Sequence, residues 1–506
     1  MGDLYHNSER REQQIKRLQH GGPGGRLTPV RGPITIDTLP DDVLLEIFVF
    51  YRLDLTTVTT HWDLHWKWHR LAHVCHKWRQ LIFASPRRLN LQLICKPGTP
   101  VRRNLDCWPA LPVVIDFRGS PSSGFLYKVL GSDEDNIVAA LEHPGRVCGI
   151  YLDVTSSLLR KMDAVMQGPF MALTSLLLSS KDRIVPVLSD EFLGGFAPGL
   201  LHLSLKGISF PALPKLLLST SALSSLRLES IPITGYISPE VTVACLSALP
   251  NLKTFSIKFL SLTLPDRRSR RPPPQTRVVL PALTEFSFHG LSQYLEDLVV
   301  RIDAPLLCQL KITFFHQLVF NIPQITQFVN RTDRLRSLSR AHIKFWPCGL
   351  GVSTFIRSMD KGINRWISWL ILCSPIDWQV SSMTQIFQQS LPLHSNIEEL
   401  VIDTTSAPQG WQDDIGAIEW LDLFHPFSAV ERLHVAGELG TQVARSLEEG
   451  SRDPTMETFP KLRTLTFWSP PKLTSVEQFI TARELSGNPV IVSYSSKSWT
   501  QWFKFD

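Results

Sequence analysis

Hydrophobic residues recur in a fixed pattern along most of the chain, from about residue 85 onward. The unit is an apolar residue followed three and five positions later by two more, as in Leu200-Leu203-Leu205. The last two positions flank a third residue, an alternation typical of a short strand with one buried face. Two less regular strands are predicted around Leu91 and Ile115. Twelve regular units begin at residues 147, 173, 200, 223, 252, 283, 307, 338, 367, 397, 430 and 462.

The segments between these strands have helical character, for example residues 240–249 and 476–485. Strand, turn, helix and turn in units of about 29 residues resemble the leucine-rich repeat, in which short parallel strands and helices stack into a solenoid. We therefore predict an α/β fold with such a solenoid over residues 85–506. Asn or Cys usually stands three positions after the last strand residue of these repeats, but here that position holds residues such as Ile208 and Leu260. The turns must therefore close without an asparagine ladder.

Side chains that alternate with the buried ones would line one exposed face of the predicted sheet. Five of them are cations, which could bind an acidic or phosphorylated segment of a target protein. The alternative is an ordinary solvated sheet face. The candidate target-binding residues are Lys206, Arg227, Lys258, Lys311, Lys344 and Trp468.

The chain before the solenoid has a different pattern. Residues 1–33 are predicted to be a flexible arm that ends in a glycine-rich run, and residues 34–84 a helical module. Pro40 suits the first turn of a helix, after which Val43, Leu44, Ile47 and Phe48 give one apolar face. A second helix is predicted from an apolar stripe too wide for so small a module to bury, so another protein or the following domain should cover it. The stripe consists of Leu64, Trp68, Leu71, Cys75, Trp78 and Ile82, widened by Val74 and Leu81.

The two ends of this module resemble the F-box. Leu39-Pro40 opens the first helix, and Val74-Cys75-x-x-Trp78-Arg79-x-Leu81 follows 35 residues later, from 39 to 74. The longer middle with several tryptophans resembles versions common in fungal F-box proteins, and the repeats resemble the irregular leucine-rich repeats found behind F-boxes. The resemblance implies a small helical bundle that binds the Skp-type adaptor of a cullin–RING ubiquitin ligase. The docking residues would then be Leu39, Pro40, Val43, Leu44, Ile47, Phe48, Leu71, Val74, Cys75, Trp78, Leu81 and Ile82.

Composition limits the kind of protein further. The chain has 506 residues, 43% of them hydrophobic, which fits two or more domains or one elongated solenoid. No run of 18 apolar residues and no apolar signal segment occurs, so we expect neither a membrane span nor secretion. The eight cysteines are scattered without a Cys-x-x-Cys pair, which indicates neither a disulfide framework nor a zinc knuckle. A cytoplasmic or nuclear location is therefore expected.

The net charge is only +6, but two segments concentrate positive charge. Residues 66–103 contain nine Lys or Arg and no Asp or Glu, and the proline-rich loop predicted over 265–277 contains a run of arginines. Such segments could bind nucleic acid or an acidic partner. The simpler interpretation is a solvated surface and an insertion loop.

Known catalytic motifs are missing from the sequence. It has no phosphate-binding Gly-rich loop, no Gly-x-Ser-x-Gly and no His-Glu-x-x-His. His61, His65, His69 and His73 recur every four residues, but on a helix they would lie mostly on the polar face, so we predict no metal site. We therefore expect no enzyme and no cofactor.

The leading hypothesis is a substrate-recognition subunit of a Skp-cullin-F-box ubiquitin ligase, whose solenoid binds the target protein. One alternative is a leucine-rich interaction scaffold in which the F-box-like helices only cap the solenoid. The other is a nucleic-acid-binding protein that uses the basic segments, an interpretation that the mild net charge makes the weaker one.

Overall fold

The computed structural model separates the chain into two compact units, Met1–Leu91 and Gln92–Asp506. The predicted arm and nearly all of the predicted proline-rich loop lie outside the residues that the structure describes. The described residues are 36–53, 67–86, 88–89, 91–107, 111–118, 129, 131–261, 276–317, 319–336, 338–346, 349–356, 365–372, 376–390, 394–404, 416–435, 439–452, 458–468 and 473–495.

The first unit is a small helical module. A 3-10 turn, η1 (Ile36–Thr38), precedes the helix α2 (Asp41–Leu53). The helix begins with two acidic residues, Asp41 and Asp42, whose negative charges interact favourably with the positive end of the helix dipole. The single second helix that we predicted is wrong, because this part forms α3 (Lys67–Ala72) and α4 (His76–Ala84). The helical conformation is interrupted before α4. The backbone of Cys75 is extended there, and its Sγ accepts a hydrogen bond from the Trp78 amide at 3.4 Å. Cys75 therefore caps α4. The predicted stripe is divided between these two helices from Leu71 onward, and Leu64 lies outside the described residues.

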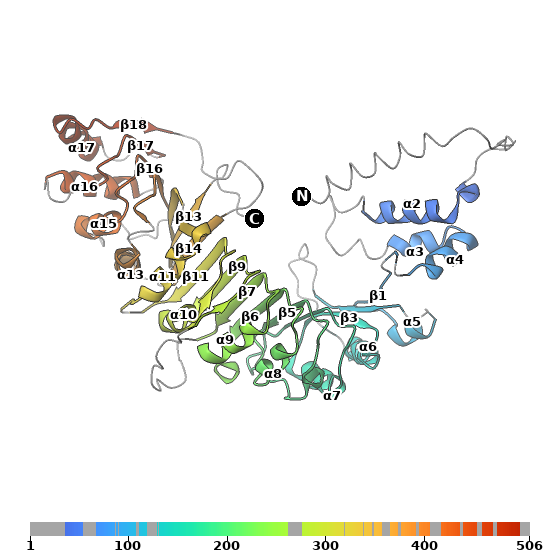
Figure 1. Cartoon of the computed structure of the whole chain (residues 1–506). Coiled ribbons are helices and arrows are strands. Elements are labelled where there is room, and N and C mark those ends of the chain that lie inside the picture. The colour runs from blue at the N-terminus through green and yellow to red at the C-terminus, as the bar shows by residue number, and fades with distance from the viewer. Residues whose placement is uncertain are drawn as a thin grey trace. The chain divides into compact units, whose positions relative to one another are not determined.

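The second unit is built on one long sheet of sixteen strands among the described residues. Most neighbouring strands are parallel, and helices follow the outer side of the curved sheet (Figure 1). The strands in chain order are β1 (Leu93–Cys95), β2 (Val113–Asp116), β3 (Val147–Asp153), β4 (Ser175–Ser179), β5 (His202–Lys206), β6 (Ser225–Ile231), β7 (Thr254–Phe259), β9 (Glu285–Gly290), β11 (Gln309–Phe315), β12 (Arg340–Trp346), β13 (Gly349–Ile356), β14 (Arg365–Leu372), β15 (Glu399–Thr404), β16 (Arg432–Val435), β17 (Thr464–Phe467) and β18 (Ile491–Tyr494).

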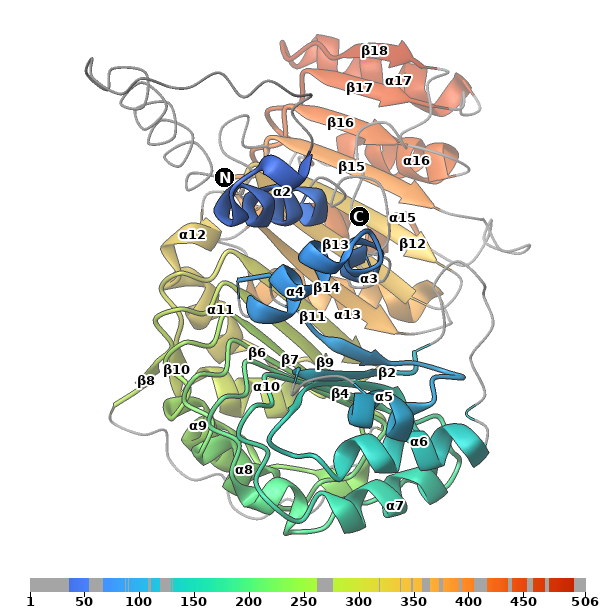
Figure 2. The same ribbon diagram turned by 90° about the vertical axis from the view of Figure 1, so that its right-hand side faces the viewer.

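Helices connect most of these strands. In Figure 2 the strands β15 to β18 lie one above the other at one end of the sheet, beside α16 and α17. A separate two-stranded parallel sheet pairs β8 (Val278–Val279) with β10 (Ile302–Asp303). The helices are α5 (Val101–Cys107), α6 (Gly131–Leu141), α7 (Ser156–Val165), α8 (Leu213–Leu218), α9 (Pro239–Ser247), α10 (Ser292–Val299), α11 (Pro323–Asn330), α12 (Asp333–Arg336), α13 (Ile376–Gln389), α15 (Ala417–Phe424), α16 (Leu439–Arg452) and α17 (Leu473–Leu485), with 3-10 turns η2 (Phe192–Gly195) and η3 (Ile233–Gly235).

The register of the strands confirms the predicted α/β solenoid. Leu203 pairs with Leu226 and Leu205 with Leu228, so equivalent apolar positions of successive repeats stack beside one another. These rows are buried and belong to one continuous hydrophobic core that runs through the unit. Each repeat buries its apolar face only against its neighbours, which is how a solenoid is stabilised. The sheet stays open and does not close into a barrel.

A hairpin interrupts the regular order, and here the prediction of uniformly parallel strands in chain order is wrong. The strand β12 lies beside β15, and β13 runs antiparallel between β12 and β14, which returns to pair with β11. The strand β13 escaped the sequence analysis because it lacks the three-apolar unit. In β14 the buried residues are Ile367, Trp369 and Ile371, whereas we predicted Leu370 and Leu372. This segment is apolar on both faces, so its pattern alone could not fix the register.

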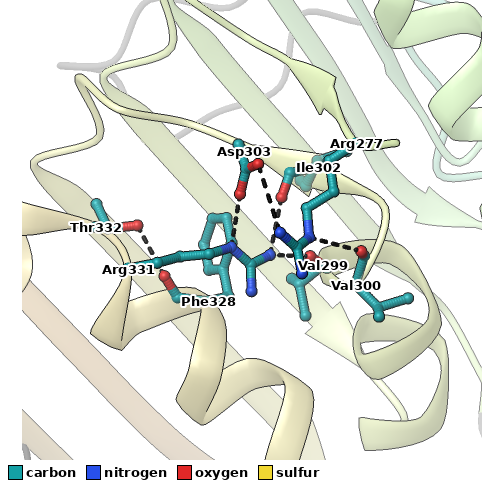
Figure 3. Close-up of polar contacts among 8 residues, drawn as sticks. All are labelled: Arg277, Val299, Val300, Ile302, Asp303, Phe328, Arg331 and Thr332. Atoms are coloured by element: carbon teal, nitrogen blue, oxygen red, sulfur yellow. Dashed lines mark hydrogen bonds and ion pairs between the residues drawn. The ribbon is translucent and has the colours of Figure 1, made fainter. Parts of the chain in front are cut away.

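Two arginines close the turn that follows α10. The guanidinium of Arg331 donates to Asp303 at 2.6 Å and to the carbonyl oxygens of Val299 and Ile302 at 2.6 and 3.0 Å. Arg277 adds a hydrogen bond to the carbonyl of Val300 at 3.2 Å, and Figure 3 shows both arginines directed toward Asp303. Burial lowers the pKa of Arg331, while Asp303 acts in the opposite direction. This cluster ties α10, α11 and the small sheet together.

A buried histidine makes the stability of the second unit depend on pH. His394 is 1% exposed, and its Nε2 lies 3.1 Å from the hydroxyl of Ser390. Burial lowers the pKa of His394 to about 3. The unfolded chain therefore binds a proton between about pH 6.5 and pH 3 that the folded chain does not bind, so stability falls as the pH drops through this window.

Between pH 6.5 and pH 5, the titration of His394 should lower the free energy of unfolding of the native chain by about 2 kcal/mol. Urea unfolding of the native chain and of His394→Leu at both pH values would measure it, because the difference between the two proteins cancels the titration of other groups. An equal pH dependence of the two proteins would contradict the assignment.

Candidate functional site

The helical module has its own small core. Leu44, Phe48, Trp78 and Ile82 are at most 7% exposed, and the rings of Phe48 and Trp78 meet edge to face with centroids 4.7 Å apart. Four of the twelve predicted docking residues thus lie inside the module in this structure. They hold the bundle together, and their side chains are not available on its surface.

The surface of α2 carries the apolar residues that the core leaves out. Val43 is 42% exposed and Ile47 38%, and they continue into the exposed Phe50 and Tyr51. These four residues, at positions i, i+4, i+7 and i+8, form one stripe along the helix. We name it the α2 stripe. Phe50 and Tyr51 were not among the predicted docking residues, although their spacing from Val43 was a signal that could have found them.

The second half of the predicted docking set is divided in the same way. Val74 is exposed in the break between α3 and α4. Partly buried positions are Leu39, Leu71, Cys75 and Leu81, and Pro40 is exposed. The module thus offers the α2 stripe, Pro40 and Val74 as accessible apolar surface.

Ion pairs fix the start of α2 to the rest of the module. Lys77 on α4 donates to the carbonyl of Leu39 at 3.2 Å and lies 3.5 Å from Asp41. Arg88 bridges Asp42 and Glu46 at 3.1 and 2.9 Å. Hydrogen bonds to Glu46 and Asp42 raise the pKa of Arg88. Two of the cations in the basic segment 66–103 are therefore already paired within the module.

On the solenoid, four of the predicted target-binding residues lie on strands that are neighbours in the sheet. Lys206, Arg227 and Lys258 lie on β5, β6 and β7, and Lys311 lies on β11 beyond β9. Lys344 is separated from this group, because β14 and β13 stand between β11 and β12. It lies over the Trp346 ring, at 5.8 Å from the centroid.

Trp468 lies further away still, after β17. Its ring stacks on His434 with centroids 5.7 Å apart and planes at 5°. The six predicted residues therefore fall into separate groups along the sheet, a separation that the sequence pattern did not indicate.

Only part of the positive charge of the first group is neutralised. Lys258 lies 2.8 Å from Glu229. Burial alone would raise the pKa of Glu229, but the hydrogen bond from Lys258 and the charges of Lys258, Lys206 and Arg227 together lower it. Lys206, Arg227 and Lys311 are exposed and form no ion pair within the described part of the chain.

A row of hydroxyl groups crosses the same face and was also missed. In register, Ser204 stands beside Arg227, followed by Ser256, Ser287 and then Lys311. Each occupies the middle position between the two last apolar residues of its unit. That position was visible in the sequence, but the pairing of strands was needed to place these residues side by side.

Charges on the far part of the face are matched among themselves. Glu399 on β15 lies 3.1 Å from Arg340 on β12 and 3.4 Å from Arg432 on β16, and its other oxygen is 3.7 Å from His434. These contacts cross three adjacent strands, so we interpret them as a structural row rather than a binding site.

Comparison with known proteins identifies the first unit. Residues 36–91 match the family model described as F-box-like. The chain therefore carries an F-box-like domain, and the predicted F-box is confirmed. A search of curated proteins found no match. None of the described helices is long and apolar enough to cross a membrane.

Proposed function

We propose that this protein is the substrate-recognition subunit of a Skp-cullin-F-box ubiquitin ligase. F-box domains generally bind Skp-type adaptors, and the second unit offers an extended sheet face for a target. In this function the chain carries out no chemistry and needs no cofactor. It raises the effective concentration of a target lysine near the ubiquitin-loaded enzyme. Its place of action would be the cytoplasm or the nucleus.

The observation that carries the proposal is the accessible apolar surface on the F-box-like domain. Val43 and Ile47 stay exposed although the module has a complete core beneath them. Apolar residues that a small domain leaves together on one helix face are typical of a protein-binding surface. We therefore assign adaptor binding to the α2 stripe, with Val74 as a further contact.

The test is co-purification of the full chain with a Skp-type adaptor, followed by titration. We expect Ile47→Glu to weaken adaptor binding at least 30-fold, because a charge would enter an apolar contact that the complex desolvates. Gln80→Glu is the matched control, since it adds the same charge at an exposed polar position of α4. Circular dichroism should show that both variants stay folded.

Two results would contradict the proposal at different points. Full adaptor affinity in Ile47→Glu would mean that the α2 stripe is not the docking surface. If the folded native chain binds no Skp-type adaptor, the ligase proposal falls and the interaction scaffold becomes the better explanation.

The nucleic-acid alternative loses support from the contacts of the basic segment. Lys77 and Arg88 pair with acidic residues of α2, and Arg102 lies 3.3 Å from Glu142. Cations that are paired in this way contribute less to binding of a phosphate backbone.

A further inference from the structure

The sheet face between β5 and β11 has the composition of an anion-binding site. Its central row reads Ser204, Arg227, Ser256, Ser287 and Lys311 across five adjacent strands. Adjacent strands are about 4.8 Å apart, so Arg227 stands one strand to one side of Ser256 and Lys311 two strands to the other. Every side chain in this row is a hydroxyl or a cation, and each can donate a hydrogen bond.

Two polar atoms on this face are buried without a hydrogen-bond partner among the described residues. The hydroxyl of Ser256 is one, although the residue is only 5% exposed. The Nε2 atom of His289, a residue that pairs in register with Lys258, is the other. A buried polar atom without a partner is costly, and a bound ion that completes its hydrogen bonds is one recognised explanation for it.

The net charge of the sheet face between β5 and β11 is positive. Glu229 and Glu285 are the acidic residues on β6, β7 and β9, whereas Lys258, the exposed Lys206, Arg227 and Lys311 add four positive charges. Lys258 is engaged with Glu229. Four cations against two carboxylates leave two surplus positive charges around Ser256. Glu285 stands in register with Thr254 and lies 3.4 Å from its hydroxyl.

We propose that the row from Arg227 to Lys311 binds a phosphoserine or phosphothreonine of the target protein, with the phosphate over Ser256 and Ser287. This inference rests on the proposed function in one respect, namely that the ligand is a segment of the target. A phosphate dianion matches the two surplus charges, and its three terminal oxygens can accept from several donors at once. A carboxylate has one charge and fewer acceptor positions. The extended segment would lie across the strands, with Lys206 near a flanking acidic residue.

The experiment uses the full chain and three fluorescent peptide libraries that are identical except at one fixed central position. That position holds phosphoserine, serine or glutamate, and the flanking positions are degenerate. We expect the phosphoserine library to bind at least tenfold more tightly than the other two. Equal binding of the phosphoserine and serine libraries would overturn the proposal, and equal binding of the glutamate library would show a carboxylate site instead.

Variants then locate the site. Arg227→Gln and Lys311→Gln should each weaken binding of the phosphoserine library about tenfold, because each removes one charge-assisted contact. The matched control is Arg160→Gln, which removes an exposed cation from α7, on the helix side of the sheet. Unchanged binding in both face variants would show that the phosphate binds elsewhere.

Ser256→Ala separates a binding role from a structural one. The change removes a buried hydroxyl that has no partner, so thermal stability should stay equal or rise slightly, while phosphoserine binding weakens several-fold. A loss of stability would show that Ser256 holds the fold, and unchanged binding would remove it from the site.

Adaptor co-purification keeps the two proposals distinguishable. The three face variants should bind the adaptor like the native chain. If phosphoserine binding fails while adaptor binding holds, only the inference about the ligand is wrong. If adaptor binding fails while phosphoserine binding holds, only the ligase role is wrong.

Discussion

Replacing Trp78 with alanine is expected to unfold the F-box-like domain and to leave the solenoid folded. Trp78 is 7% exposed and packs edge to face on Phe48. Removing a buried aromatic side chain costs about 3–5 kcal/mol. A module of this size has a total stability of only about 5 kcal/mol, so the loss takes away most of it. The second unit has its own continuous core and should not respond.

Hydrogen exchange measured by mass spectrometry would follow the two units separately. Peptides from α2 and α4 should lose their protection in Trp78→Ala, while those from β5 to β7 keep it. Trp78→Phe is the control, because it keeps an aromatic ring against Phe48. Protected α2 amides in Trp78→Ala would mean that Trp78 is not part of the core.

This result also separates two ways of losing adaptor binding. Ile47→Glu should weaken binding with the domain intact, whereas Trp78→Ala should weaken it by unfolding the domain. The adaptor itself offers a further check, since a ligand that binds only the folded state restores stability by mass action. Excess adaptor should therefore raise the hydrogen-exchange protection of α2 and α4 in Trp78→Ala, whereas in Ile47→Glu these helices should be protected without adaptor.

The division of α2 into a core face and an exposed face could not be predicted from the sequence. Val43, Leu44, Ile47 and Phe48 occupy one continuous arc of the helix, and each of them is apolar. Which half faces inward depends on where α3 and α4 pack. The surplus of apolar surface was predicted for the second helix, and finding which residues of α2 stay exposed required the tertiary structure.

The solenoid was largely predictable, for a physical reason. Its repeats contact their sequence neighbours, so local patterns such as Leu203 and Leu205 carry most of the information about the fold. The exception is the hairpin of β12 and β13, where the chain passes three strands along the sheet before it returns. Such a connection leaves no periodic signal. Partners like Glu399 and Arg340 were equally hidden, because the antiparallel strands changed which residues are neighbours.

Replacing Arg331 with alanine is expected to destabilise the second unit by about 3 kcal/mol. The side chain is 23% exposed and makes the closest ion pair of Asp303, whose other arginine, Arg277, lies 3.9 Å away. Its loss would also leave the carbonyl oxygens of Val299 and Ile302 without this donor. Breaking a buried ion pair costs about 3–5 kcal/mol, and the partial exposure of both residues places this one at the lower end.

A lysine cannot take the place of Arg331, because the contacts use a planar group with several donors in fixed directions. Arg331→Lys should therefore recover less than half of the lost stability in urea unfolding, although it restores the charge. Arg445→Ala is the control, since this exposed arginine on α16 pairs with Glu449, one helical turn away. Full recovery by lysine would show that charge alone is needed at this turn. Recovery of less than half of the lost stability would mean that multiple hydrogen bonds from one side chain close the turn after α10.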